Sequence, residues 1–263
     1  MPHFISRGNG PRVICLHCSG GSSRQWQHFA EQMQDRFEIT AIDLYGYGQT
    51  PGWQPGMPLS LEDEAALLDN FIMQSQEPVY LIGHSYGGAV AFAAALRHKS
   101  MVKGLIMYEP VLFNLFNIAP GCTNSNKEIR LLSMKIDRLV SAGKTFDAAR
   151  VFVNYWTGDS SFDGMQYSKQ LAVADKVHKI NDDFKAIFAT PVSTHSIRSL
   201  AARTFILHGS KSPQPVVEIA ERLNRLVPGS VKLGFDGLGH MGPVTHRELI
   251  NNVLDNIISG LES

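Results

Sequence analysis

The pentapeptide Gly83-His84-Ser85-Tyr86-Gly87 constrains the fold more than any other part of this chain. It joins a short apolar run, residues 78–83, to a segment with helical spacing that begins at Tyr86. A strand that turns directly into a helix brings neighbouring backbone close together, and glycines on both sides of the serine avoid the collision. The pattern therefore predicts a sharp strand–turn–helix bend that exposes Ser85 at the carboxyl end of a strand.

The same alternation of strand and helix runs through most of the sequence. Further apolar runs typical of strands cover residues 13–17, 37–43, 102–108, 204–208 and 231–235. Helices are expected from Ser22 to about Gln34 and from Ser60 to about Met73, because both serines precede Gln or Asp by three residues. Two more are expected from Pro213 to about Val227 and near Glu248–Ile258. This order predicts an α/β fold with a mostly parallel sheet covered by helices.

After Pro110 the alternation stops. Residues 129–140 and 146–156 have helical periodicity, and nothing up to about residue 200 resembles a strand. We therefore expect residues 1–110 and 200–263 to form the core domain. Residues 111–199 are expected to form a helical insertion into that domain.

Composition argues against several classes of protein. The 24 Lys and Arg residues balance the 24 Asp and Glu residues, so we expect no basic surface for nucleic acid or anionic lipid. No apolar stretch approaches the roughly 20 residues of a membrane helix, and residues 1–12 lack the apolar centre of a secretory signal. The three cysteines, at 15, 18 and 122, cannot all pair. We therefore expect a soluble, cytoplasmic protein.

Several landmarks resemble the α/β-hydrolase-fold family along nearly the whole chain. They are the strand ending in Leu16-His17, the run Asp43-Leu44-Tyr45-Gly46-Tyr47-Gly48, the elbow at Ser85 and the run Gly239-His240-Met241-Gly242-Pro243. The resemblance implies the α/β-hydrolase fold with a helical cap, or lid, inserted after the sixth core strand. It also implies hydrolysis of an ester or a related carbonyl compound, with no metal or organic cofactor.

A serine hydroxyl becomes a useful nucleophile when a neighbouring base takes its proton. Ten histidines are available, and His240 follows the last expected strand in a glycine-rich loop. Loops at the carboxyl ends of parallel strands are where such folds assemble reactive groups. His240 also matches the family's catalytic histidine. We therefore expect Ser85 to be the nucleophile and His240 the base.

The acid of the expected catalytic triad departs from the family pattern. Most relatives carry an aspartate where this chain has Ser212, which we interpret as a helix N-cap. Some relatives carry the acid at the end of the preceding core strand, and Glu109 stands there in this chain. We expect Glu109 to be the acid. The alternative is that Glu109 only fixes the first loop of the cap by bonding to backbone.

An oxyanion hole and a substrate pocket should adjoin the nucleophile. Backbone N–H groups of Tyr86 and Ser19 are expected to bind developing negative charge, with Cys18 in place of a glycine usual in relatives. The spacing of Cys15 and Cys18 lacks the second cysteine pair of a zinc site, so we expect no metal. Four aromatic residues of the insertion could line an apolar pocket: Phe113, Phe116, Tyr155 and Trp156.

The leading expectation is a serine carboxylesterase that cleaves a small or medium, largely apolar ester through an acyl-enzyme on Ser85. A carbon–carbon bond hydrolase, a lactonase or a perhydrolase would use the same site and stays open. Epoxide hydrolases and haloalkane dehalogenases resemble this fold but carry aspartate at the elbow, which disfavours them. A ligand sensor with weak activity is the alternative from another class, because Ser212 and Cys18 depart from the pattern. The sequence leaves a monomer and a homo-oligomer equally open.

Overall fold

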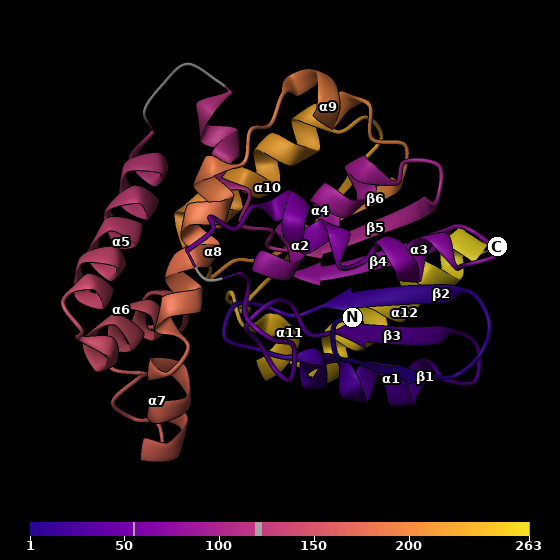
Figure 1. Cartoon of the computed structure of the whole chain (residues 1–263). Helices are drawn as coiled ribbons and strands as arrows, with labels where there is room; N and C mark the ends of the chain where they lie inside the picture. Colours follow the sequence, from indigo (N-terminus) through magenta and orange to yellow (C-terminus); the bar gives the residue numbers. More distant parts are fainter. Residues whose placement is uncertain (55, 119–122, 263) are drawn as a thin grey trace.

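A computed structural model describes residues 1–54, 56–118 and 123–262. Within these residues seven strands form one sheet in the order β1-β3-β2-β4-β5-β6-β7 (Figure 1). β1 is antiparallel to β3, and all other neighbouring strands are parallel. The strands are β1 (Phe4–Arg7), β2 (Arg12–Leu16), β3 (Glu38–Ile42), β4 (Val79–His84), β5 (Val102–Tyr108), β6 (Arg203–Gly209) and β7 (Val231–Phe235).

The expected α/β-hydrolase fold is confirmed, and every strand expected from an apolar run is present to within a residue or two. Strand β1 was not expected. It lies at the edge of the sheet, where it pairs Phe4 with Ile42 and Arg7 with Ile39. Because most of β1 is exposed, it lacks the apolar run that marks the central strands.

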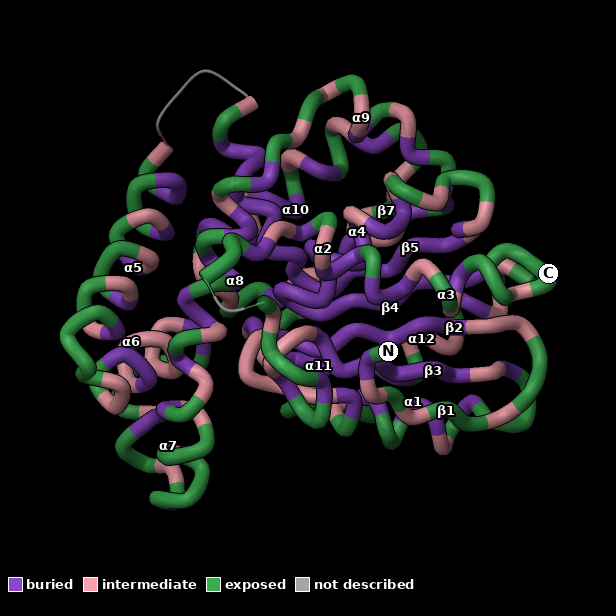
Figure 2. The backbone as a smooth tube through the Cα atoms, viewed as in Figure 1, coloured by how far each residue is buried: buried purple, intermediate pink, exposed green. Residues whose placement is uncertain are grey.

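Helices cover both faces of the sheet, and successive side chains of β2 point into the buried clusters on opposite faces. Val13 and Cys15 belong to one buried cluster, whereas Ile14 and Leu16 belong to the other. The first cluster is covered by α1 (Gln27–Met33) and α12 (Arg247–Glu262). The second is covered by α2 (Leu61–Ala66), α3 (Asp69–Met73), α4 (Tyr86–Arg97) and α10 (Gln214–Leu226). Figure 2 shows nearly continuous burial along β4 and β5.

The spacing of Ser60 from Asp63 and of Ser22 from Gln25 predicts a capping box at the start of each helix, and the two have different outcomes. At Ser60 the box is present, although the helix it starts is broken at Leu67 into α2 and α3. Ser22 occupies the N-cap position of η1 (Ser23–Trp26), but its side chain makes no cap hydrogen bond, so the capping box is absent there. The neighbouring N–H of Ser23 instead donates to Asp43 Oδ1 at 2.6 Å. The chain passes through a 3₁₀ turn, η1 (Ser23–Trp26), before α1 begins.

Between β5 and β6 the described residues form helices and no strand. These elements are η2 (Phe113–Asn117), α5 (Asn124–Ser141), α6 (Thr145–Thr157), α7 (Tyr167–Ala174), α8 (Val177–Ala189) and α9 (Thr194–Arg198). In Figure 1, α5, α6 and α8 lie beyond the carboxyl ends of the parallel strands. The insertion was expected after the sixth core strand. In this seven-stranded sheet it follows β5, the fifth strand in chain order. Among the described helices, none has the length and apolar character to cross a membrane.

Candidate active site

The turn between β4 and α4 holds Ser85 in a strained backbone conformation. Its φ is 56° and its ψ is −117°, a region that residues with a side chain rarely adopt. A Cβ on Gly83 would lie 2.3 Å from the carbonyl oxygen of Gly87, and a Cβ on Gly87 would lie 2.5 Å from that of Leu16. Only glycine fits at either position, so the turn itself accounts for the glycines of the pentapeptide.

Hydrogen bonds connect Ser85, His240 and Glu109 in series. His240 Nε2 lies 2.9 Å from Ser85 Oγ, and His240 Nδ1 lies 2.6 Å from Glu109 Oε2. A carboxylate only accepts, so Nδ1 carries the imidazole proton and Nε2 is left to accept from the hydroxyl. All three residues are buried, with Ser85 the most exposed at 5%. The structure therefore brings together the three residues expected from the sequence, in the tautomer that can take a proton from serine.

Glu109 is also held from its other side. Its Oε1 accepts the backbone N–H of Gly209 at 2.7 Å and a hydrogen bond from the Ser212 hydroxyl. The backbone of Glu109 has a φ of 47°, which is a second strained position where the chain leaves β5. Groups at the end of β6 thus aim the carboxylate at His240.

The structure corrects the interpretation of Ser212 as a helix cap. Pro213 occupies the N-cap position of α10, and no side chain caps that helix. The hydroxyl of Ser212 donates to Glu109 instead. A carboxylate at position 212, within hydrogen-bonding distance of Glu109, would repel the carboxylate of Glu109. Ser212 thus supports the carboxylate of Glu109 through a hydrogen bond.

Two backbone N–H groups near Ser85 are free to bind an anion. Tyr86 is the first residue of α4, where N–H groups have no helical acceptor. The N–H of Cys18 donates to Gln25 Oε1 at 3.2 Å, so it is occupied. Across the described part of the chain, no hydrogen bond uses the N–H of Ser19 or of Tyr86. Ser19 rather than Cys18 thus presents a free donor in the loop after β2.

A chain of hydrogen bonds beside Ser85 links this loop to that of His240. Gln25 Nε2 lies 3.1 Å from His84 Nδ1, and His84 Nε2 lies 2.8 Å from the carbonyl oxygen of His240. Burial lowers the pKa of His84 well below its ordinary value, so the ring is neutral. Because a carbonyl only accepts, Nε2 of His84 carries the proton and Nδ1 accepts from the amide of Gln25. No sequence motif indicated this role for Gln25.

A second buried network ties the insertion to the core. Asp183 of α8 accepts from the hydroxyl of Ser19 at 2.5 Å and from that of Tyr47 at 2.6 Å. Lys179, one turn earlier, contacts Asp183 and lies 2.8 Å from Glu64 Oε1 of α2. Burial raises the pKa of both carboxyl groups. The i, i+4 spacing of Lys179 and Asp183 was visible in the sequence, but their distant partners were not.

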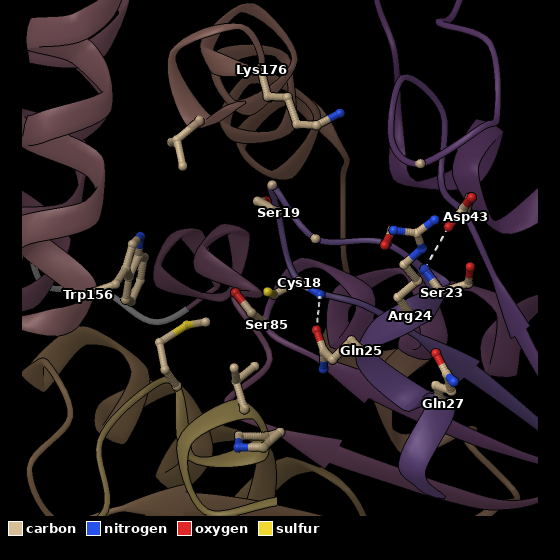
Figure 3. Close-up of a pocket in the computed structure, with 18 of the residues that line it drawn as sticks. Cys18, Ser19, Ser23, Arg24, Gln25, Gln27, Asp43, Ser85, Trp156 and Lys176 are labelled. Atoms are coloured by element: carbon tan, nitrogen blue, oxygen red, sulfur yellow. Dashed lines mark hydrogen bonds between the residues drawn. The ribbon is translucent and has the colours of Figure 1, made fainter. Parts of the chain in front are cut away.

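Trp156 of α6 covers the candidate base directly. Its ring stacks on the imidazole of His240, with centroids 4.0 Å apart and planes inclined by 27°. It also lines a cavity of about 1340 Å³ that contains Ser85 and His240 (Figure 3). The insertion therefore forms one wall of the space above Ser85.

The other three aromatic residues expected in the pocket do not line this cavity. Phe113 and Phe116 are buried, and their rings lie parallel to each other. Tyr155 stacks edge-on against Trp156 and donates its hydroxyl to Glu128 at 2.7 Å. The sequence identified aromatic residues of the insertion, but it did not separate those that pack the insertion from the one that lines the cavity.

The cysteines and acidic residues form no metal site in the described part of the chain. Cys15 and Cys18 are both buried and unpaired, and Cys122 lies outside the described residues. Asp43 accepts backbone N–H groups of its own turn and of η1, as a structural residue would.

Comparison with known proteins finds partial matches to enzymes of several kinds. The chain is 35% identical to lipase LipV of Mycobacterium tuberculosis over 106 residues, which is 40% of this chain and 39% of the lipase. It is 35% identical to the pimeloyl-[acyl-carrier protein] methyl ester esterase of Pseudoalteromonas atlantica over 100 residues, 38% of this chain and 37% of the esterase. It is 29% identical to a haloalkane dehalogenase of Agrobacterium fabrum over 117 residues, 44% of this chain and 38% of the dehalogenase. The matches thus span less than half of each relative.

Solved structures match over a greater length. MenH from S. aureus has a TM-score of 0.80 and 18% identity, with both chains fully covered. A thermophilic esterase from Thermogutta terrifontis has a TM-score of 0.76 and 21% identity, covering 99% of this chain and 94% of the esterase. At these identities the likeness establishes the fold alone. The sequence profile of the alpha/beta hydrolase family matches residues 13–253. This chain therefore belongs to the alpha/beta hydrolase family.

Proposed function

We propose that this protein is a serine hydrolase that cleaves a carboxylic ester through an acyl-enzyme on Ser85. The observation that carries the proposal is the unbroken contact from Ser85 Oγ through the imidazole of His240 to Glu109. Two of the partial relatives, a lipase and a methyl ester esterase, are named for ester cleavage, which supports the choice of bond.

In the first step Ser85 Oγ attacks the carbonyl carbon of the ester. The hydroxyl proton passes to His240 Nε2, and the ring becomes an imidazolium that keeps its Nδ1 proton toward Glu109. The carboxylate stabilises this positive charge. The face of Trp156 stacked on the ring adds a cation–π contribution of about 0.5–2 kcal/mol.

The carbonyl oxygen becomes an oxyanion in this intermediate and accepts from the free N–H groups of Ser19 and Tyr86. The amino end of α4 carries a partial positive charge, which favours the same oxyanion. Loss of one such donor lowers the rate of comparable enzymes by roughly 100- to 1,000-fold. When the intermediate collapses, the bond to the alcohol breaks and His240 Nε2 returns its proton to the departing oxygen.

Water completes the cycle by reversing these roles. His240 Nε2 takes a proton from the water while the water oxygen attacks the acyl carbon. The acyl–oxygen bond to Ser85 then breaks, and His240 protonates the serine oxygen. The products are the free acid and the alcohol, and the enzyme returns to its starting state.

The site does not bear equally on the alternatives to ester hydrolysis. Carbon–carbon hydrolysis, lactone hydrolysis and perhydrolysis use the same nucleophile, so product analysis has to separate them from ester hydrolysis. A dehalogenase-type reaction is disfavoured by the serine at the elbow. The case for a ligand sensor is weakened, because Ser212 supports Glu109 and the Ser19 N–H is free where that of Cys18 is occupied.

A fluorophosphonate probe tests the nucleophile. We expect covalent labelling of the wild-type protein on Ser85, and hydrolysis of p-nitrophenyl acetate. Both should be lost in Ser85→Ala. Ser22→Ala is the matched control, since Ser22 lines the same cavity and makes no cap hydrogen bond. Labelling that persists in Ser85→Ala, or a folded wild-type protein that neither labels nor hydrolyses, would contradict the proposal.

A further inference from the structure

The cavity above Ser85 has two chemically different walls. The insertion supplies apolar side chains: Phe152, Val153, Trp156, Met165 and Val173. Four cationic side chains also line the cavity: Arg7, Arg24, Lys176 and Arg247. In Figure 3, Trp156 and Arg24 lie on opposite sides of Ser85, and Lys176 approaches from the insertion. A ligand that fills this space meets an apolar surface and a positively charged one.

The positive charge of the cavity is not neutralised from within. Asp43 is the only carboxylate among the described lining residues. Its oxygens already accept from the N–H groups of Ser23 and Gln49 and from the ring of His3, at 2.6, 2.9 and 2.8 Å. The chain as a whole has no net charge, so the excess of cations at this cavity is local.

Arg24 and Lys176 differ from the paired cations elsewhere on the surface. Arg97 and Arg150, for example, form ion pairs with aspartates at 2.8 Å. Within the described ranges, neither Arg24 nor Lys176 has a carboxylate partner. Lys176 is half-buried, and its Nζ lies 5.5 Å from the centroid of the Tyr47 ring, beside the Ser19 loop. Cations left free at a cavity are available to a ligand.

We infer that the substrate of this site is an ester that carries a separate anionic group, bound by Lys176 and Arg24. The inference rests on the proposed function and refines the expected apolar ester. The acyl or alcohol segment next to the scissile bond lies against Trp156 and its apolar neighbours. The anionic group, a carboxylate or a phosphate, lies toward the guanidinium and ammonium groups, which bind both anions.

A matched pair of activated esters tests the inference by turnover. The p-nitrophenyl esters of adipic acid and of monomethyl adipate differ by one ionised carboxylate. We expect kcat/KM to be higher for the anionic ester by about three- to fivefold for each engaged cation, and the preference to shrink as salt is added. Lys176→Glu and Arg24→Glu should each lower the ratio of the two values. The control Lys169→Glu makes the same charge change on the exposed part of α7, outside the cavity, and should leave the ratio unchanged.

A binding measurement decides the inference without turnover. Ser85→Ala is titrated calorimetrically with monomethyl adipate and with dimethyl adipate. Tighter binding of the monoanion that Lys176→Glu abolishes supports the inference, even if labelling of Ser85 fails and the proposed function with it. Equal binding of the two probes overturns the inference and leaves the hydrolase proposal intact. Competition by monobutyl phosphate against monomethyl adipate then tells a phosphate site from a carboxylate site.

Discussion

Replacing Glu109 with glutamine is expected to slow the reaction for a reason specific to this site. Glu109 Oε1 accepts from the backbone N–H of Gly209, which cannot turn away. The amide oxygen of Glu109→Gln therefore has to occupy the Oε1 position, and its NH₂ group faces His240 Nδ1. An NH₂ group only donates, so the imidazole must hold its proton on Nε2. That is the nitrogen that has to accept the proton of Ser85.

The size of the effect follows from the contacts. Restoring the productive tautomer requires the amide to flip, which sets an NH₂ group against the N–H of Gly209 and costs about 1–3 kcal/mol. Loss of the anion removes a charged hydrogen bond to the imidazolium, worth about 1.5–3 kcal/mol. The sum of about 2.5–6 kcal/mol corresponds to a fall in kcat of roughly 10²- to 10⁴-fold.

The assay is hydrolysis of p-nitrophenyl acetate by folded protein, with Glu109→Ala as the comparison. Alanine removes the anion but imposes no tautomer, so Glu109→Ala should retain about tenfold more activity than Glu109→Gln. Thermal unfolding of both variants excludes a folding defect as the cause. If Glu109→Gln is the faster of the two, the tautomer argument is refuted.

Two further predictions concern buried groups. Burial lowers the pKa of His17 to about 4 in the folded protein. As the pH falls below about 6.5, His17 is therefore protonated in the unfolded chain before it is protonated in the folded one. The unfolding free energy then decreases by about 1.4 kcal/mol per pH unit. The unfolding free energy of wild type relative to His17→Gln should thus shrink by about 2 kcal/mol between about pH 7 and pH 5 in urea titrations; a difference independent of pH would contradict the burial argument. Asp183→Asn should lower kcat about tenfold at unchanged KM and lower the unfolding free energy by about 3 kcal/mol, because it weakens the hold on the Ser19 loop and leaves Lys179 with Glu64 alone. An unchanged kcat in the folded variant would show that Asp183 has no role in positioning that loop.

Local patterns were enough to predict much of this molecule. The strands carry strong apolar runs, and the glycines around Ser85 have a direct steric cause. The contact among Ser85, Glu109 and His240 also followed, because parallel strands bring their carboxyl ends to one edge. The edge strand β1 was not predicted, because it is mostly exposed and lacks an apolar run.

The remaining features depend on contacts between distant side chains. Gln25 and His84 lie 59 residues apart, and Asp183 lies 164 residues from Ser19. Ser212 fits a helix cap by every local criterion, yet its hydroxyl is used by Glu109. Phe113 and Phe116 were expected in the pocket because they are aromatic residues of the insertion, but which surface they face depends on how the insertion folds onto the core.

The position of Glu109 has a practical consequence for exchanging parts between relatives. Glu109 directly follows the last residue of β5 and is followed by Pro110, so the carboxylate proposed to orient His240 stands at the entrance to the insertion. In relatives with an acid after the next strand, a chimera made between these strands leaves the acid in the recipient. Here a graft that includes residue 109 would remove it. Any chimera intended to change substrate preference must therefore be joined after Glu109.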